Sequence, residues 1–122
     1  MQGVVFMGDR KLEFMEFSDP IPGPDEIVLE IRASGMCGSD LKFYRASGGA
    51  SALGLGGDGS PVIAGHEPCG DVVDIGKDVD PERVQIGQRV MVHHYKGCGV
   101  CNHCLDGWGQ LCRDGIVVYG AT

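Results

Sequence analysis

Apolar residues in this chain occur in short runs that glycine and proline interrupt. Residues 3–7 are a short apolar run, and residues 12–17 and 27–32 alternate between two faces. A period of two is typical of a β-strand that turns one face towards a core. Residues 19–25 hold three prolines and a glycine, so we expect a connection there instead of regular structure.

The second half of the chain continues the same pattern of short strands and turns. The apolar runs predict strands at residues 61–64, 71–75 and 89–95, the start of another at 117–119, and a connector at 81–88. Several short strands joined by glycine- and proline-containing turns favour an antiparallel barrel or sandwich. The predicted fold class is therefore mainly β, with short helices.

The segment between the third and fourth strands differs from the rest. Residues 40–45 fit one or two helical turns, which Ser39 or Asp40 could cap because their side chains accept from free amide groups. Residues 46–60 are rich in glycine and predict a mobile loop. Residues 54–59 match Gly-x-Gly-x-x-Gly, but no strand precedes them and no helix follows, so we expect no dinucleotide site.

Composition narrows the choice of partners. The chain has 122 residues, which favours one domain or part of one, and its net charge is -7. Without a cluster of lysine and arginine, nucleic acid and anionic membranes are unlikely partners on electrostatic grounds. No apolar run has the length of a membrane span, and the N-terminus lacks the pattern of a signal peptide. We therefore expect a cytoplasmic protein.

Four of the six cysteines lie close together near the end of the sequence. Cys98, Cys101 and Cys104 are separated by two residues each, and Cys112 follows after seven more. These gaps let a chain fold around one ion, and four thiolates form the closed tetrahedral shell of a structural zinc site. The spacing predicts a zinc-binding lobe at residues 97–113.

Three other interpretations of this lobe stay open at this point. An iron–sulfur cluster also uses closely spaced cysteines, although the bacterial ferredoxin run has a shorter last gap followed by proline. Disulfides or free thiols are possible, but a cytosolic chain with crowded cysteines more often binds metal. His103 could also replace one of the cysteines as a zinc ligand. Trp108 and Leu111 are expected to pack the lobe onto the barrel.

Cys37, His66 and Glu67 form a second candidate metal set. A cysteine, a histidine and a carboxylate leave room for an exchangeable fourth zinc ligand, which zinc needs to act as a Lewis acid on a substrate oxygen. Taken alone this set is weak evidence. A lone cysteine is usually a small buried hydrophobe, and a His-Glu pair is usually a surface turn.

The order of the motifs resembles the medium-chain, zinc-dependent alcohol dehydrogenases. Gly-x-Cys-Gly-Ser-Asp is followed by Gly-His-Glu-x-x-Gly-x-Val-x-x-x-Gly, by Gly-x-Arg-Val and by the four-cysteine lobe; these are residues 35–40, 65–76, 87–90 and 98–112. The resemblance covers almost the whole chain. It implies that residues 1–122 are the N-terminal part of a GroES-like catalytic domain, and that a Rossmann cofactor domain is absent.

The resemblance also implies roles for matching residues. Cys37 and His66 would bind a catalytic zinc, with Glu67 as an alternate ligand or a neighbour of the ligands. Ser39 would hydrogen-bond the substrate hydroxyl and relay its proton, while a hydride passes to NAD or NADP. The lobe cysteines would hold the structural zinc: Cys98, Cys101, Cys104 and Cys112. Each of two residues also has a purely structural alternative. Ser39 could only cap the helix, and Glu67 could be a buried partner of an arginine.

The chain departs from the family pattern at several positions. Lys42 stands where many relatives place a histidine of the proton relay, so the lysine either takes part or is merely solvated. His94 stands where relatives often carry an aromatic residue that lines the pocket. Gln88 replaces a common aspartate, and Cys69 is expected in the core. The third protein ligand of the catalytic zinc lies further along in the family than this sequence extends.

These observations lead to three hypotheses about function. The first is part of an NAD(P)-dependent oxidoreductase that acts on an alcohol, a polyol or a similar small molecule, homo-oligomeric when complete and inactive as this chain alone. The second is a stand-alone, zinc-stabilised β-barrel that serves as a binding module. The third is an iron–sulfur electron carrier. The resemblance favours the first, with one tightly held zinc in the lobe and a weak or absent second ion.

Overall fold

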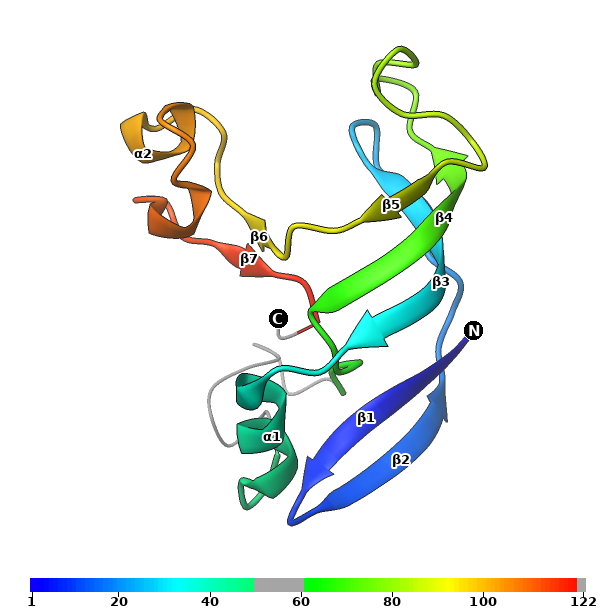
Figure 1. Ribbon diagram of the computed structural model, residues 1–122, viewed down its shortest axis with the longest axis vertical. Coiled ribbons are helices and arrows are strands. Elements are labelled where there is room, and N and C mark those ends of the chain that lie inside the picture. The colour runs from blue at the N-terminus through cyan, green and yellow to red at the C-terminus, as the bar shows by residue number, and fades with distance from the viewer. Residues whose placement is uncertain (50–60, 121–122) are drawn as a thin grey trace.

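The described part of the chain is built around three small antiparallel sheets (Figure 1). The computed structural model describes residues 1–49 and 61–120. Within them, two strands form a hairpin, three form a sheet in the order β3–β4–β5, and two form a short pair near the cysteines. The strands are β1 (Gln2–Gly8), β2 (Lys11–Glu16), β3 (Ile27–Gly35), β4 (Glu67–Ile75), β5 (Arg89–Met91), β6 (Tyr95–Lys96) and β7 (Val117–Val118).

Short helical elements complete the fold. Helix α1 (Gly38–Arg45) follows β3, while α2 (Asn102–Leu105) and a 3-10 turn (Gly109–Leu111) lie within the cysteine lobe. The predicted mainly β class with short helices and a lobe is therefore confirmed. The Gly-x-Gly-x-x-Gly motif at residues 54–59, and most of the predicted loop around it, lie outside the described residues.

Three predicted strands differ from those in the structure. The run at residues 89–95 is divided into β5 and β6, because the chain leaves the edge of β4 after Met91 and then pairs with β7. The run at residues 61–64 contributes only an isolated bridge between Val5 and Ile63. Strand β4 instead begins earlier than expected, at Glu67, where it pairs with Gly35 at the end of β3.

The alternating pattern of β3 does not translate into alternating burial. Ile27 and Leu29 are half-buried, but the side chain of Ile31 is 54% exposed. The register between β3 and β4 shifts twice, between Val28 and Leu29 and between Ile31 and Ala33. The first shift places the extra residue, Val73, on β4, and the second places it, Arg32, on β3, so the faces of the two strands do not stay in step along the pair.

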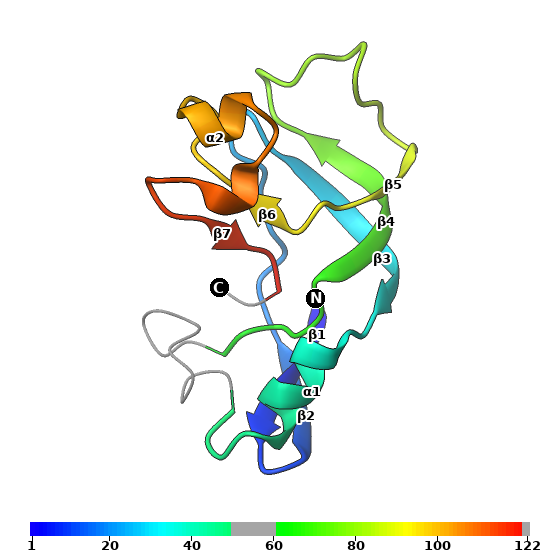
Figure 2. The ribbon, with the colours of Figure 1, turned by 60° about the vertical axis from the view of Figure 1, so that its left-hand side comes forward.

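Helix α1 is fastened to the β1–β2 hairpin at its C-terminal end. The amide of Arg10 donates to the carbonyl of Tyr44, at 2.9 Å, and the amide of Asp9 donates to that of Ala46, at 3.0 Å. The rings of Phe6 and Tyr44 meet edge to face, with centroids 5.9 Å apart. Figure 2 shows α1 beside this hairpin, with its N-terminal end turned towards the three-stranded sheet.

One carboxylate links all three strands of the central sheet. Asp71 on β4 accepts hydrogen bonds from Arg89 on β5, at 2.8 and 3.1 Å, and from Arg32 on β3, at 2.8 Å. These two guanidinium groups, Arg89 foremost, lower the pKa of Asp71 to about 2. The opposite face of β4 carries Val72, which is almost fully buried.

The cysteine lobe projects from the rest of the fold (Figure 1). Trp108 and Leu111 are 56% and 57% exposed, so the expectation that they pack the lobe onto a barrel is wrong. Inside the lobe the buried apolar residue is Cys101, whose neighbours are other cysteines. Local turns and sulfur contacts therefore shape this region more than apolar burial does. In residues 1–49 and 61–120, no helix has the length and apolar character needed to cross a lipid bilayer.

Candidate functional site

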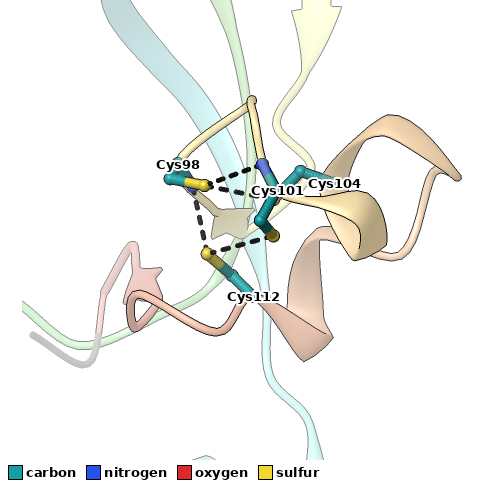
Figure 3. Close-up of side chains that lie close together, drawn as sticks. All are labelled: Cys98, Cys101, Cys104 and Cys112. Atoms are coloured by element: carbon teal, nitrogen blue, oxygen red, sulfur yellow. Dashed lines mark hydrogen bonds between the residues drawn. The ribbon is translucent and has the colours of Figure 1, made fainter.

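The four lobe cysteines converge on one point. Cys98, Cys101, Cys104 and Cys112 come from the turn after β6, from α2 and from the end of the 3-10 turn, and their sulfur atoms all lie within 4.8 Å of one another. Figure 3 shows the four side chains turned towards a common centre. The sulfurs of Cys98 and Cys104, and those of Cys101 and Cys112, are 4.0 Å apart.

These separations fit a single tetrahedral ion. Zinc–sulfur bonds of about 2.3 Å give sulfur–sulfur edges of roughly 3.8 Å, close to the observed 4.0 Å. A disulfide requires a separation of about 2.05 Å, roughly half of that distance. A cluster of several irons would hold the sulfurs on different metal atoms and therefore further apart. The donor set and its spacing thus favour zinc, and the exposed His103 stands outside the group.

The backbone around the lobe prepares one thiol for a cation. Amide groups of Arg113 and Cys104 hydrogen-bond to the sulfur of Cys101 and lower the pKa of that thiol to about 6. The amide of Cys101 in turn donates to the sulfur of Cys98, at 3.3 Å, but Asp114, burial and Cys112 raise the pKa of that thiol to about 12 in the absence of a cation. Amide donors stabilise negative charge on sulfur, which is the form in which cysteine binds metal.

Helix α1 is capped by Cys37, not by Ser39 or Asp40 as the sequence suggested. Cys37 is the N-cap, and its sulfur accepts from the amide of Ser39 at 3.3 Å. Asp40 returns the contact, because its Oδ2 accepts from the amide of Cys37 at 2.8 Å. This reciprocal capping box fixes the start of the helix. Ser39 is therefore not the cap, and its hydroxyl is free for other contacts.

Asp40 also holds His66, which comes from the turn just before β4. Nδ1 of His66 lies 3.1 Å from Oδ1 of Asp40, and both side chains are buried. A carboxylate only accepts, so this bond assigns the ring proton to Nδ1. Nε2 is then the nitrogen that faces Cys37, whose sulfur lies 3.1 Å away. The sequence suggested only a capping role for Asp40; a carboxylate three residues after a candidate zinc cysteine was the available signal.

Ser39 completes a compact polar group with these two residues. Its hydroxyl lies 2.8 Å from the sulfur of Cys37 and 3.4 Å from Nε2 of His66. The hydroxyl contact, with the Ser39 amide, lowers the pKa of Cys37. A thiol with a lowered pKa is a better metal ligand, because the thiolate is the form that coordinates.

Glu67 joins the same group from the first position of β4. One ligand atom each of Cys37, His66 and Glu67 lies within 4.8 Å of the other two. Glu67 is exposed, which contradicts the alternative of a buried partner of an arginine. Gly35 faces Glu67 across the strand pair, and a Cβ at Gly35 would collide with the Glu67 carboxylate. Gly35 and Cys37, which are distant from Glu67 in the sequence, thus lie close to it because β3 pairs with β4.

The donor set of this second group also suits zinc. Sulfur, imidazole and carboxylate are the three kinds of protein ligand found in catalytic zinc sites, which keep a fourth position open. Imidazole held by a buried carboxylate is the arrangement that commonly orients a histidine ligand towards a metal. Among the described residues, this is the second of two such groups, and the lobe is the other.

Three further residues singled out in the sequence occupy different places. The ring of half-buried His94 lies against that of His66, with centroids 5.0 Å apart, so it borders the candidate metal site. Lys42 is exposed on α1. Cys69 is half-buried on β4, beside Met91 of β5, and belongs to neither cysteine group.

Comparison with known proteins identifies the family of the chain. Residues 23–122 match the family model of the alcohol dehydrogenase GroES-like domain. The chain is 33% identical over 114 residues to L-threonine 3-dehydrogenase of Cutibacterium acnes, covering 90% of this chain and 31% of the relative. It is 36% identical over 122 residues to a protein of Mycobacterium tuberculosis described as a probable zinc-binding alcohol dehydrogenase, covering 99% of this chain and 29% of the relative.

A solved structure shares the fold at similar coverage. An alcohol dehydrogenase from Escherichia coli, in complex with NADH, superposes with a TM-score of 0.75 at 28% identity, over 99% of this chain and 32% of that one. The chain thus spans about a third of the length of the relatives that it matches. Because the family model covers most of the sequence, the chain belongs to the medium-chain, zinc-dependent alcohol dehydrogenase family, in its GroES-like domain.

Proposed function

We propose that this chain supplies the zinc- and hydroxyl-binding part of an NAD(P)-dependent oxidoreductase that acts on an alcohol, a polyol or a similar small molecule. The observation that carries the proposal is the meeting of Cys37, His66 and Glu67 within 4.8 Å, with the hydroxyl of Ser39 beside them. Residues 1–122 would form the N-terminal part of the catalytic domain. Names of relatives, among them a threonine dehydrogenase, support a hydroxyl-bearing substrate.

Each ligand of the candidate catalytic site has its own support. Cys37 would bind through a thiolate whose pKa Ser39 lowers, and His66 would bind through Nε2 because Asp40 holds Nδ1. Glu67 would supply the third donor from β4. A zinc ion bound by such a set supplies Lewis-acid chemistry, lowering the pKa of a hydroxyl group brought next to it.

Ser39 is the residue best placed to handle the proton of the substrate hydroxyl. Its oxygen is within 3.4 Å of Nε2 of His66 and 2.8 Å of the sulfur of Cys37, so a hydroxyl that approaches this point can hydrogen-bond to it. Serine both accepts and donates, which lets it pass a proton onward. Lys42 is exposed one turn further along α1 and could exchange protons with solvent. His94 would line the substrate side of the site.

The lobe would bind a second zinc with a structural role. Four cysteine ligands leave no position for a substrate, and structural zinc sites contribute their binding free energy directly to folding. Residues 97–113 would depend on this ion for their shape, because Trp108 and Leu111 are exposed and contribute little apolar burial.

The hydride acceptor would be NAD or NADP. A related alcohol dehydrogenase was solved with NADH, which supports a nicotinamide cofactor for the whole protein. Within residues 1–49 and 61–120, helix α1 lies between β3 and β4, but these strands are antiparallel, unlike the parallel strands of a dinucleotide-binding unit. The 122-residue chain alone is therefore expected to show negligible turnover with NAD(P) and a panel of alcohols. Robust turnover would contradict that expectation. The complete enzyme is expected to be a cytoplasmic homo-oligomer.

Zinc titration of the metal-free chain tests the proposal. We expect one tightly bound ion in the lobe and a weaker second ion at Cys37, His66 and Glu67. C37S should abolish the weaker binding and leave the tight binding intact, while C69S, at a half-buried cysteine outside both groups, should change neither. If C37S and the unsubstituted chain bind zinc identically, the proposed catalytic site is wrong. Visible absorbance from bound iron would instead indicate an iron–sulfur protein.

A further inference from the structure

We infer that Gly120 is a positioning residue for His66, an inference that rests on the proposed role of His66 as a metal ligand. Gly120 follows β7 and has a positive φ of 78°. A Cβ at this position would overlap the carbonyl oxygen of Gly65 and lie 2.6 Å from its carbon and 3.1 Å from the amide nitrogen of His66. The backbone of Gly120 therefore lies directly against the Gly65–His66 peptide.

A side chain of β3 also lies close to this peptide. Gly65 has a positive φ of 109°, and a Cβ there would lie 2.7 Å from the hydroxyl oxygen of Ser34 on β3. Contacts below 3.0 Å essentially never occur for a real Cβ, and at Gly120 the atoms that would have to shift belong to the backbone. At Gly65 the atom is the Ser34 hydroxyl oxygen, which can turn aside, so the tighter restriction on the peptide that carries His66 comes from Gly120.

The position of Gly120 is set by the cysteine lobe. The amide of Tyr119 donates to the carbonyl of His94 at 3.0 Å, and β7 pairs with β6 through Tyr95 and Val118. The two strands of this pair flank the lobe, one entering it and one leaving it (Figure 1). A continuous backbone connection therefore runs from the lobe through β7 to the peptide that precedes His66.

Through this connection the lobe also influences the orientation of His66. When β6 and β7 are held together, Gly120 presses on the Gly65–His66 peptide and keeps Nδ1 of His66 near Asp40. A side chain at residue 120 would push that peptide away and change the direction of Nε2. Residues that orient a metal ligand typically change metal affinity by about 10- to 100-fold when they are altered.

The test compares G120A with G115A in the 122-residue chain. Gly115 also has a positive φ, of 94°, but a Cβ there would meet nothing within 4 Å, so G115A carries the backbone strain without the collision. We expect G120A to weaken zinc at the second site by on the order of tenfold or more, leaving the lobe zinc bound. We also expect it to shift the NMR signals of the His66 amide and ring in the chain that holds one equivalent of zinc, which fills the lobe only. G115A should do neither.

A second measurement needs no substitution. One equivalent of zinc fills the lobe first and should shift the His66 amide signal of the unsubstituted chain, whereas the amide of Gly87, in the distant connector before β5, should not move. If G120A matches G115A in both zinc affinity and His66 signals, or if lobe zinc leaves His66 unchanged, the inference is wrong. If the unsubstituted chain binds no second zinc, the proposed catalytic site fails, and the His66 signals still decide the role of Gly120.

Discussion

Asp40 and His66 join the two segments that carry the candidate zinc ligands. Oδ1 of Asp40 lies 3.1 Å from Nδ1 of His66, while Oδ2 of the same carboxylate accepts from the amide of Cys37. One buried side chain therefore orients a ligand on each side: it caps the helix that begins at Cys37 and holds the ring of His66. Both oxygens are needed, so the pair predicts sensitivity to substitution.

Replacing Asp40 with asparagine should weaken metal binding at Cys37, His66 and Glu67. An asparagine has one acceptor oxygen in place of two, so it can support the helix start or the His66 ring but not both. We expect zinc affinity at this site to fall by about 10- to 100-fold, measured by titration with the lobe already filled. D78N, at an exposed aspartate in a turn, is the matched control. Equal affinity in D40N and D78N would refute the orienting role.

Removal of one lobe cysteine should abolish the structural zinc. C112S replaces a thiolate with a poor zinc ligand, so the lobe should lose its ion and its local structure. We expect the zinc content of the purified chain to fall by one equivalent, and its thermal unfolding midpoint to fall as well. C69S should retain both values, because Cys69 lies outside the lobe. A chelator should reproduce the C112S result in the unsubstituted chain.

The free energy of unfolding should depend on pH between about 4 and 2 through the ionisation of Asp71. The pKa of Asp71 in the folded chain is about 2, below the usual 3.8, because Arg89 and Arg32 bind its ionised form. Because the pKa of Asp71 is lower in the folded chain than in the unfolded chain, the ionised carboxylate stabilises the fold at pH values above about 4. This stabilisation is lost as the pH falls from about 4 towards 2 and the carboxylate becomes protonated.

The measurement for Asp71 is denaturant unfolding of the chain across this pH range. D71N should unfold at a lower urea concentration than the unsubstituted chain at pH 6, and the difference should shrink below pH 4. D25N, at an exposed aspartate in the connection before β3, should show no such convergence. A constant difference at every pH would show that charge on Asp71 is not what links the three strands.

Trp108 reports on the exposure of the lobe surface. It is the single tryptophan of the chain and is 56% exposed. Its fluorescence in the zinc-loaded chain should therefore be readily quenched by acrylamide, and W108A should cost much less than the roughly 3–5 kcal/mol of a core aromatic truncation. Strong protection from acrylamide would mean that this surface is covered in solution, for example by a second copy of the chain.

Most of the fold class could be predicted from the sequence because short-range patterns carry it. Alternating residues in 12–17, and the proline-rich connection at 19–25, correspond to β2 and to the link before β3. The strand boundaries that differ depend on partners distant in sequence. Residues 89–95 read as one strand, yet β5 pairs with β4 and β6 pairs with β7, and only the folded chain brings both partners together.

For the sites, the sequence alone determined the lobe, because metal ligands spaced two residues apart can surround one ion through local turns. It also determined the family, through motifs in a fixed order. Tertiary structure decided what joins the second group. Cys37 and His66 lie 29 positions apart, and their meeting depends on Asp40, on the pairing of β3 with β4, and on the backbone of Gly120. A buried contact between two polar side chains and a long-range backbone contact leave no periodic trace in a sequence, so these relationships appear only in the folded molecule.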